Sequence, residues 1–427
     1  MRDAPQIALI GTLDTKGVEI DYVAGRVREL GGRPTVIDVG ILDEPTGDPA
    51  DIPRDEVARA GGRALQELQT IGSRGAAVEG MCDGARAVLL SLWSEGRLDG
   101  ALCLGGAEGA LLGAAGMHAL PVGVPKLIVS PSASGRRVFG PFVGETDTCV
   151  MHSVIDILGI NPISRAVFDN AAAAVVGMAR MAGGAVGALG GATIGITMLG
   201  QTTPGVMRLR DRLADAGLAS VIFHANGVGG PAMERLLEQG ALGGVVDYTL
   251  SEIANSVKDG IHAVGPDRLT VAGRLGIPQL VVPGCVDFFN QGAPDTVPEE
   301  YRGRRSYFHN RVATLVGMSP DEMREAAALI AERLAGARGP VAVVAPTVGF
   351  SLSGVPGEAL WDDEANGAFL AALEQRLPET IRLELVGADV NAPEFADRVA
   401  TRALDLFGSL TRTPLEAPSR SLRGENA

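Results

Sequence analysis

The sequence is poor in aromatic residues and cysteines, and both shortages narrow what the protein can be. Aromatic side chains make up 4% of the 427 residues, although 46% of the chain is hydrophobic. The core must therefore consist of Ala, Val, Leu and Ile, which is typical of parallel strands buried between helices. The four cysteines lie far apart without a metal-binding spacing, so we expect neither a disulfide framework nor a cysteine-bound metal.

Basic charge and long apolar runs are also scarce. The 37 basic and 51 acidic side chains give a net charge of −14, which disfavours binding to nucleic acid or anionic membranes. The chain has no apolar run of about 18 residues and no apolar signal-peptide core, so we expect a cytoplasmic protein without membrane contact. The net charge does not exclude a small anionic ligand, because backbone N–H groups can bind one locally.

Glycine, in contrast, is abundant, with 58 residues. Such an excess is typical of tight turns between strands and helices. Short buried runs such as Ile7–Gly11 and Gly100–Leu104 alternate with amphipathic segments such as Ser164–Ala182, which predicts a doubly wound α/β fold. We interpret Phe139–Val143 as a further strand and Met151–Leu158 as a helix.

A glycine-rich stretch, Gly183–Gly191, predicts a boundary between two lobes, because the strand–helix pattern begins again after it. We expect a nucleotide-binding Rossmann-like lobe over residues 1–187, a second Rossmann-like lobe over 188–410 and a flexible tail over 411–427. Each lobe should contain a mainly parallel sheet flanked by helices.

Ligands of open α/β sheets bind at the carboxyl ends of the strands, so the loops there are the candidate binding segments. The loop Gly11–Gly17 offers glycines, hydroxyl groups, a lysine and a helix N-terminus, although it is neither a dinucleotide-binding nor a Walker A motif. Asp14 could hold Mg²⁺ or cap the helix. Helix packing or an ordinary turn would also explain the loops Gly105–Gly109 and Ser130–Gly135. The candidate phosphate-binding residues of this lobe are Gly11, Thr12, Asp14, Thr15, Lys16, Gly105, Gly106, Glu108, Gly109, Ser130, Ser134 and Gly135.

The second lobe has similar loops after its first two predicted strands. Gly200–Gly205 follows the first strand, and His224–Gly230 follows the next. These loops are rich in glycine and hydroxyl groups, as the phosphate-binding segments of the first lobe are. They add the candidate phosphate-binding residues Gly200, Thr202, Thr203, Gly229 and Gly230.

Titratable groups at the ends of strand-like segments in this lobe are candidates for acid–base chemistry. They are His224, Glu252, Asp287 and His309. A structural role explains His224 equally well. Cys285 is more readily a buried apolar residue than a nucleophile, because no base is evident beside it.

An alternative ligand for the first lobe is NAD(P). Asp38 ends the second predicted strand, where dinucleotide-binding proteins place the acid that binds the ribose. The loop before it lacks the dinucleotide glycine spacing, so the sequence favours ATP over NAD(P).

Six segments spread over nearly the whole chain resemble one known family when they are taken in order. They are Gly11–Gly17, Met151–Ile157 with Asn161, Thr202–Pro204, Phe223–Ala225 with Gly229–Gly230, Ala272–Pro278, and Val282–Asn290. On these segments the chain resembles the Tm-one-like ATP-binding proteins. The resemblance implies two Rossmann-like subdomains, ATP binding, homodimerisation and a TIM-barrel partner similar to phosphoenolpyruvate-using enzymes. It implies no particular reaction.

The chain departs from that family's pattern, chiefly in the second lobe. Ala107 and Ala110 replace a glycine and a threonine of the family's first-lobe loop. In the second lobe, His309–Arg311 replaces His-Asn-Pro, Gly354 replaces an aspartate, and Asp389–Ala392 replaces His-x-Asn-Asp. A family site that depends on these groups is therefore altered here.

Three functional hypotheses follow. The first is a nucleotide-binding protein that holds ATP and Mg²⁺ on the Gly/Thr loops. The second is an enzyme that acts on a small carbonyl or carboxylate metabolite in a cleft between the lobes. The third is an interaction module, whose Ala/Gly-rich helices would suit close packing in a dimer.

Overall fold

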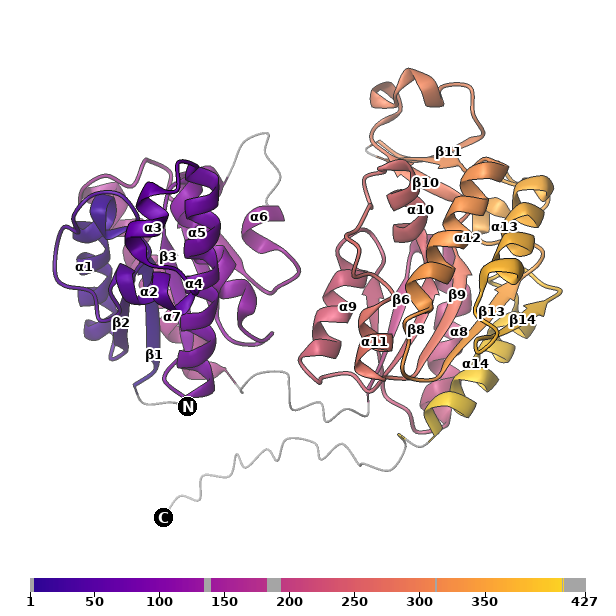
Figure 1. The fold of residues 1–427 in the computed structure, drawn as a ribbon, viewed down its shortest axis with the longest axis horizontal. Helices are drawn as coiled ribbons and strands as arrows, with labels where there is room; N and C mark the ends of the chain where they lie inside the picture. The colour runs from indigo at the N-terminus through magenta and orange to yellow at the C-terminus, as the bar shows by residue number, and fades with distance from the viewer. Residues whose placement is uncertain (1–3, 134–139, 183–192, 312, 409, 411–427) are drawn as a thin grey trace, which may run out of the picture. The chain divides into compact units, whose positions relative to one another are not determined.

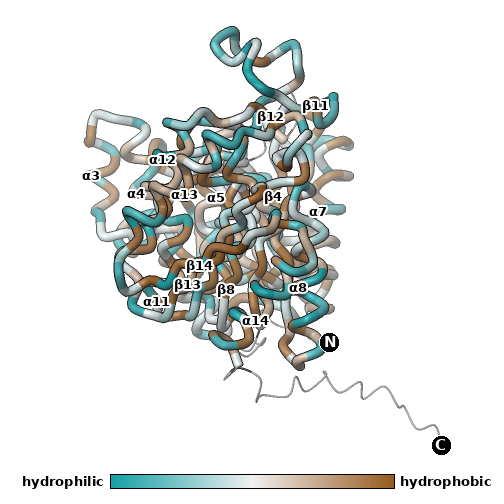
Figure 2. The backbone as a smooth tube through the Cα atoms, turned by 90° about the vertical axis from the view of Figure 1, so that its right-hand side faces the viewer, coloured by the Kyte–Doolittle hydropathy of each residue, from teal (hydrophilic) through white to brown (hydrophobic). Residues whose placement is uncertain are grey.

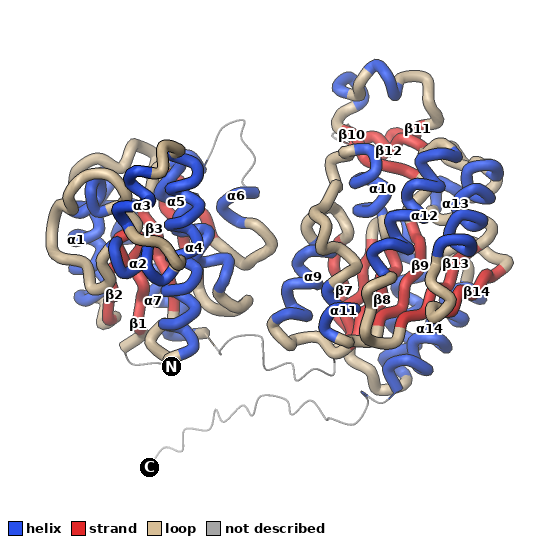
Figure 3. The backbone as a smooth tube through the Cα atoms, in the orientation of Figure 1, coloured by secondary structure: helices blue, strands red, loops and turns tan. Residues whose placement is uncertain are grey.

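The computed structural model describes residues 4–133, 140–182, 193–311, 313–408 and 410 (Figure 1). Its contacts divide the chain into two compact units, Met1–Val186 and Gly187–Ala427. Each unit contains a parallel sheet flanked by helices (Figure 3). The predicted α/β class with two Rossmann-like lobes is confirmed.

The first unit is built on a five-stranded parallel sheet. Its strand order is β2-β1-β3-β4-β5, and β1 pairs with β2 on one side and β3 on the other. β3 and β4 are buried along their whole length, as strands covered on both faces must be. The strands are β1 (Gln6–Gly11), β2 (Arg33–Asp38), β3 (Gly100–Leu104), β4 (Lys126–Ser130) and β5 (Cys149–His152).

Helices cover both faces of this sheet. On one face of the sheet, Leu9 and other alternate strand residues pack in a core with α1 and α7. On the other face, Ile10 and its neighbours pack with α2–α5. The small residues of α4 and α5 are used within the unit: a Cβ on Gly113 would lie 2.3 Å from the Cys103 sulfur. The helices are α1 (Leu13–Glu29), α2 (Arg54–Ala60), α3 (Leu65–Thr70), α4 (Arg74–Ser94), α5 (Ala107–Ala119), α6 (Gly140–Val143) and α7 (Pro162–Met181).

The second unit contains a six-stranded parallel sheet in the order β14-β13-β9-β8-β6-β7. Hydrophobic residues run along the largely buried strand β13, whereas the helix α8 is largely hydrophilic (Figure 2). The strands are β6 (Ile194–Met198), β7 (Ser220–His224), β8 (Gly244–Thr249), β9 (Gln279–Gly284), β13 (Val341–Pro346) and β14 (Arg382–Val386). The helices are α8 (Thr203–Asp215), α9 (Gly229–Glu238), α10 (Ser251–Lys258), α11 (Val271–Leu275), α12 (Pro320–Leu334), α13 (Asp363–Arg376) and α14 (Pro393–Phe407).

The two sheets share one topology. In each, the first strand of the unit lies between the second and the third, and every later strand is added beyond the third. The strand order therefore reverses between β1 and β3 in the first unit, and between β6 and β8 in the second. These switch points are where open α/β sheets bind ligands.

A small antiparallel sheet in the second unit was not predicted. Its order is β10-β12-β11, and its strands are β10 (Phe288–Gln291), β11 (Ser306–Asn310) and β12 (Ala313–Gly317). The hydrogen-bonded pairing of β10 with β12 joins segments more than twenty residues apart, which no local pattern announces.

Two local predictions in the first unit were wrong. The segment interpreted as a helix over Met151–Leu158 begins as the edge strand β5, whose Met151 pairs with Val129. The predicted strand Phe139–Val143 is the short helix α6 over its described residues. The predicted tail, residues 411–427, lies outside the described residues.

Candidate functional site

The switch point of the first sheet opens into a pocket of about 250 Å³. Residues of the loop that follows β1 and of the loop that follows β3 both line it, so two of the predicted loops meet. We call it the anion pocket. Its lining residues are Thr12, Asp14, Thr15, Lys16, Val39, Ile41, Leu42, Arg74, Gly106, Ala107, Glu108, Gly109 and Leu112.

The N-terminus of α5 faces this pocket. Its N-cap residue is Gly106, and no described side chain caps the first turn. A Cβ on Gly106 would meet no atom within 4 Å, so the position is open. Gly105 packs closely against the first turn of the helix, since a Cβ there would lie 2.5 Å from the Ala110 nitrogen. Backbone N–H groups without side-chain caps, at the positive end of a helix dipole, form a favourable site for an anion.

Asp14 carries an unpaired carboxylate oxygen beside these groups. Its Oδ2 accepts a hydrogen bond of 3.2 Å from the Leu42 nitrogen. Its Oδ1 is buried and has no hydrogen-bond partner among the described residues. Such an oxygen fits a hard divalent cation, and Mg²⁺ usually takes only one or two carboxylates besides phosphate and water. The described residues contain no cluster of three or more metal-binding side chains, so Mg²⁺ would need ligand oxygens here.

The lysine and threonines of the first loop are partly engaged by the protein. Lys16 Nζ donates to the Ile157 carbonyl oxygen at 2.5 Å. The hydroxyls of Thr12 and Thr15 bond to each other at 3.0 Å. Lys16 also has a non-helical backbone, with φ −129° and ψ 15°, which kinks α1 after its first turn. These groups line the anion pocket from its edge.

The remaining predicted residues of the first unit contribute less directly. Gly11 allows close packing, because a Cβ there would lie 2.7 Å from Ile20 Cγ1. Ser130 is fully buried, and its Oγ accepts a hydrogen bond from the Ser132 nitrogen. The predicted residues Ser134 and Gly135 lie outside the described residues.

Asp38 has no free oxygen for a ribose. Its Oδ1 accepts hydrogen bonds from the Leu13 nitrogen at 3.0 Å and the Gly40 nitrogen at 2.8 Å. Its Oδ2 forms a buried ion pair with Arg54 at 2.8 Å. The carboxylate thus fixes the loop that follows β2, and the geometry does not favour NAD(P).

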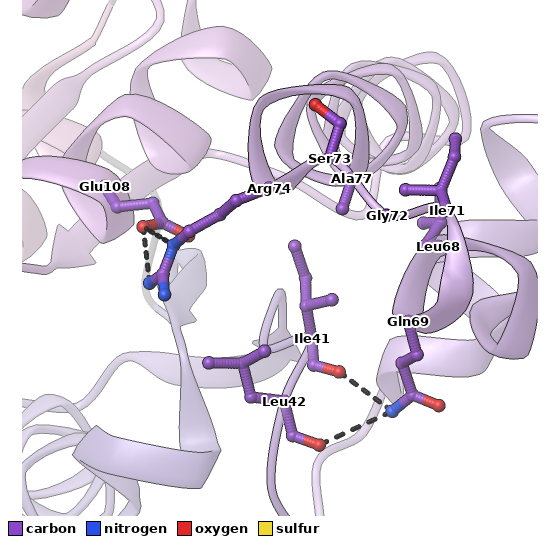
Figure 4. Close-up of a pocket in the computed structure, with 10 residues that line it drawn as sticks. All are labelled: Ile41, Leu42, Leu68, Gln69, Ile71, Gly72, Ser73, Arg74, Ala77 and Glu108. Atoms are coloured by element: carbon purple, nitrogen blue, oxygen red, sulfur yellow. Dashed lines mark hydrogen bonds and ion pairs between the residues drawn. The ribbon is translucent and has the colours of Figure 1, made fainter.

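Sequence reasoning missed Arg74 and a second cavity beside the anion pocket. Arg74, the first residue of α4, forms an exposed ion pair of 2.7 Å with Glu108. Beyond this pair lies a cavity of about 240 Å³, which we call the apolar slot (Figure 4). Its lining residues are Ile41, Leu42, Leu68, Gln69, Ile71, Gly72, Ser73, Arg74, Ala77 and Glu108.

The second switch point is filled by the protein's own side chains. Thr202 and Thr249 share a buried hydrogen bond of 2.7 Å between their hydroxyls. The Thr197 hydroxyl lies 3.2 Å from the Thr249 carbonyl oxygen and donates to it. Gln201 Oε1 accepts a hydrogen bond of 2.9 Å from the Ser353 nitrogen in the loop after β13. The predicted ligand group of Thr202 is therefore used inside the fold.

The N-terminus of α9 holds a carboxylate of the protein itself. Glu252 is fully buried, and its Oε1 accepts hydrogen bonds from the nitrogens of Gly227 at 3.1 Å and Gly230 at 3.0 Å. Its Oε2 forms an ion pair of 2.7 Å with buried Arg268. Because this carboxylate occupies the place of an anion at the helix end, the loop around Gly229 and Gly230 needs no external phosphate.

Arg268 also binds other buried carboxylates. Its Nη2 lies 2.6 Å from Asp247 and its Nη1 lies 3.5 Å from Glu234. Burial raises the pKa of Glu234 to about 8, although Arg268 opposes this shift. One arginine thus faces three carboxylates, which favours a proton on Glu234.

The other titratable candidates are dispersed. Burial raises the pKa of Asp287 to about 6, and its Oδ2 accepts a hydrogen bond of 2.6 Å from Ser351. Burial also raises the pKa of the Cys285 thiol well above its ordinary value, which disfavours a nucleophilic role. His309 is exposed on β11, in a different sheet from His224.

His262 lies near His224 and was not among the candidates for acid–base chemistry. It is half-buried, and burial together with the nearby His224 lowers its pKa to about 4. Its Nδ1 is buried without a hydrogen-bond partner among the described residues. No sequence signal pairs these histidines, because one ends β7 and the other follows α10.

Both units match models of a single family. The model described as the N-terminal domain of Uncharacterised protein family UPF0261 matches residues 5–183, and the model of its C-terminal domain matches residues 192–407. The chain belongs to this family. A UPF0261 protein of Clostridium tetani is 36% identical over 405 residues, which cover 94% of this chain and 99% of that protein. A UPF0261 protein of Brucella suis is 37% identical over 397 residues, covering 93% of this chain and 94% of that protein.

The family extends to a plant protein. The ToMV resistance protein Tm-1(GCR237) of Solanum lycopersicum is 32% identical over 426 residues, which cover 95% of this chain but 56% of that protein. The predicted relationship to Tm-one-like proteins is therefore confirmed. No described helix is both long and apolar enough to span a bilayer.

Proposed function

We propose that the first unit of this UPF0261 protein binds a nucleoside triphosphate, ATP, together with Mg²⁺. The observation that supports the proposal most is the anion pocket at the switch point of the first sheet. There no described side chain caps the helix end at Gly106, and Asp14, whose buried Oδ1 has no described hydrogen-bond partner, is a lining residue of the same pocket. A polyphosphate with a divalent cation matches this pair of groups, one donating hydrogen bonds and the other negatively charged.

The residues divide the task between them. The backbone N–H groups that follow Gly106 would bind phosphate oxygens, and Asp14 would bind Mg²⁺. Arg74 is exposed at the pocket wall, where its guanidinium forms an ion pair with Glu108 and would have to exchange this partner for a phosphate to bind one. The Lys16 ammonium is held by the Ile157 carbonyl oxygen, so it adds positive potential from the edge.

Placing a negative charge at the open helix end tests the proposal. In Gly106→Asp, the new side chain enters open space and can cap α5, so the fold should be at least as stable. The carboxylate should weaken Mg-ATP binding by more than about tenfold, because like charges about 4 Å apart repel by about 4 kcal/mol near a protein surface. Isothermal titration calorimetry of the full chain measures the affinity.

Ala392→Asp is the matched control. Ala392 is the N-cap of α14 in the second unit, and it too lacks a side-chain cap. This variant should bind Mg-ATP as the unmodified protein does. Equal affinity of both variants, or no binding of Mg-ATP to the unmodified protein, would refute the proposal.

The alternative, an enzyme acting on a carbonyl or carboxylate metabolite, has less support from the geometry. Glu252 and Asp287 are buried and bonded within the protein, which leaves His224 and His309 exposed in separate sheets. The homodimer and the TIM-barrel partner rest on the family resemblance alone and stay predictions.

A further inference from the structure

The apolar slot adjoins the anion pocket and shares four lining residues with it: Ile41, Leu42, Arg74 and Glu108. Each cavity measures about 240–250 Å³. Small-molecule sites usually have volumes of about 300–1,000 Å³, so neither cavity alone is large enough for a nucleotide. A ligand of that size would extend through both, past the Arg74–Glu108 ion pair.

The slot offers apolar contact area. Leu68 lies buried in its wall, whereas Leu42 and Ile71 are 57% and 37% exposed at its rim. Large apolar side chains exposed around a cavity are typical of a ligand site, because a bound ligand removes them from water.

The polar groups of the slot are occupied or directed elsewhere. Gln69 Nε2 donates to the carbonyl oxygens of Ile41 at 2.8 Å and Leu42 at 3.5 Å. Ser73 Oγ accepts a hydrogen bond of 3.3 Å from the Ala76 nitrogen. In Figure 4, Gln69 Oε1 and Ser73 Oγ point away from the centre of the slot. The other polar side chains of the wall, Arg74 and Glu108, form an ion pair with each other. In this arrangement no described side chain of the wall is dedicated to the edge of a base.

From this arrangement we infer that the slot holds the base of the nucleotide and does not distinguish one base from another. The inference rests on the proposed function, because the phosphates must lie in the anion pocket for the base to reach the slot. Recognition then comes from the polyphosphate and from a flat apolar body, so the site accepts nucleoside triphosphates as a class. Hydrogen bonds to a base edge would be needed for strong discrimination.

Titration calorimetry of the full chain in Mg²⁺ tests this with four probes: ATP, GTP, CTP and inorganic tripolyphosphate. The three nucleotides should bind with dissociation constants within about threefold of one another, because apolar contact discriminates weakly. Each should bind at least about tenfold more tightly than tripolyphosphate, which has no group to fill the slot.

A substitution at the rim of the slot distinguishes the contributions of the two cavities to binding. Ile71 lines the slot but not the anion pocket. Ile71→Gln should therefore weaken the binding of each nucleotide by about three- to tenfold and leave the affinity for tripolyphosphate unchanged. Leu90→Gln is the control, since Leu90 is similarly exposed at 41% and lines neither cavity.

The outcomes are distinguishable. A preference of more than about tenfold for one base would overturn the absence of base discrimination. Equal binding of ATP and tripolyphosphate, with no effect of Ile71→Gln, would overturn the base site and leave the proposed phosphate site standing. Failure of all four probes to bind would overturn the proposed function, and this inference would fall with it.

Discussion

The two sheets of this protein have the same strand order, yet their switch points contain different things. Between β1 and β3 lies a pocket of about 250 Å³, lined by an uncapped helix end. Between β6 and β8 the hydroxyls of Thr202 and Thr249 bond to each other, and both residues are fully buried. The topology determines where a ligand site can form, whereas side chains at the loop positions determine whether the place stays open.

The helix ends repeat the contrast. Gly106 begins α5 with open space beside it, whereas a Cβ on Gly230 of α9 would lie 2.0 Å from Glu252 Oε2. The first helix end is free to receive an anion. The second already has one, fixed in place by Arg268. A glycine-rich loop is thus an ambiguous signal until its neighbours are known.

Removing the Glu252 carboxylate should produce the largest effect on stability. Glu252→Ala leaves the nitrogens of Gly227 and Gly230 without their acceptor and removes one carboxylate from Arg268, which should lower the free energy of unfolding of the second unit by about 2–5 kcal/mol. The chain has two tryptophans, Trp93 in the first unit and Trp361 in the second. Urea unfolding of Glu252→Ala in a Trp93→Phe background, followed by Trp361 fluorescence, measures the loss.

Asp14→Ala is the counterpart in the first unit. Its carboxylate makes one described hydrogen bond, so the variant should lose about 1 kcal/mol or less, measured by Trp93 fluorescence in a Trp361→Phe background. If both variants lowered the free energy of unfolding by similar amounts, the two carboxylates would be equally structural. The contrast between the two switch points would then be wrong.

Two glycine substitutions, one at each helix end, should differ in their cost in stability, by a smaller amount than the carboxylate variants. Gly230→Ala forces a methyl group against Glu252 and Arg268, which should cost about 1–3 kcal/mol through overpacking. Gly106→Ala meets no atom and should cost about 1 kcal/mol or less, as expected at an N-cap. Thermal unfolding monitored by the tryptophan of each unit gives both values, and a larger loss for Gly106→Ala would contradict the comparison.

A change of pH should alter the free energy of unfolding gradually, through a single proton on Glu234. Burial raises the pKa of Glu234 to about 8, above the unfolded value of about 4.5. Between these values the folded unit binds more protons than the unfolded chain, so its stability should fall as pH rises, by at most about 1.4 kcal/mol per pH unit.

Urea unfolding from pH 5 to 8, followed by Trp361, measures this slope. Glu234→Gln retains an acceptor for the Leu269 nitrogen but cannot titrate, so the slope should flatten. An unchanged slope in this variant would assign the proton to another group, and the crowding of carboxylates around Arg268 would have to be explained differently.

Much of the fold could be predicted from the sequence, because the local composition of the buried strands indicates their structure. Runs such as Ile7–Gly11 and Gly100–Leu104 have the composition of central parallel strands, and the structure places them next to each other. Met151–Leu158 failed for a physical reason: its apolar Val154 and Leu158 are 63% and 76% exposed, so the pattern there does not describe a packed face. The sheet formed by β10–β12 was not predicted, because the pairing of β10 with β12 is not local.

The site was predictable only in part. The rule that loops after neighbouring strands converge brought Gly11–Gly17 and Gly105–Gly109 together correctly. Arg74 and Ile41 come from a long connection whose residues carry no motif, so the slot was missed. Glu252 was identified as polar and near a strand end, but its burial against Arg268 depends on a three-dimensional contact that no sequence spacing indicates.

The strand order also has a consequence for how the chain can assemble during synthesis. In each unit the first strand made is flanked by the second and the third, and each later strand joins at the free edge left by its predecessor. No strand has to insert between two that are already paired. A chain emerging from the ribosome could therefore extend each sheet one strand at a time, with the unpaired edge always the next strand's docking place.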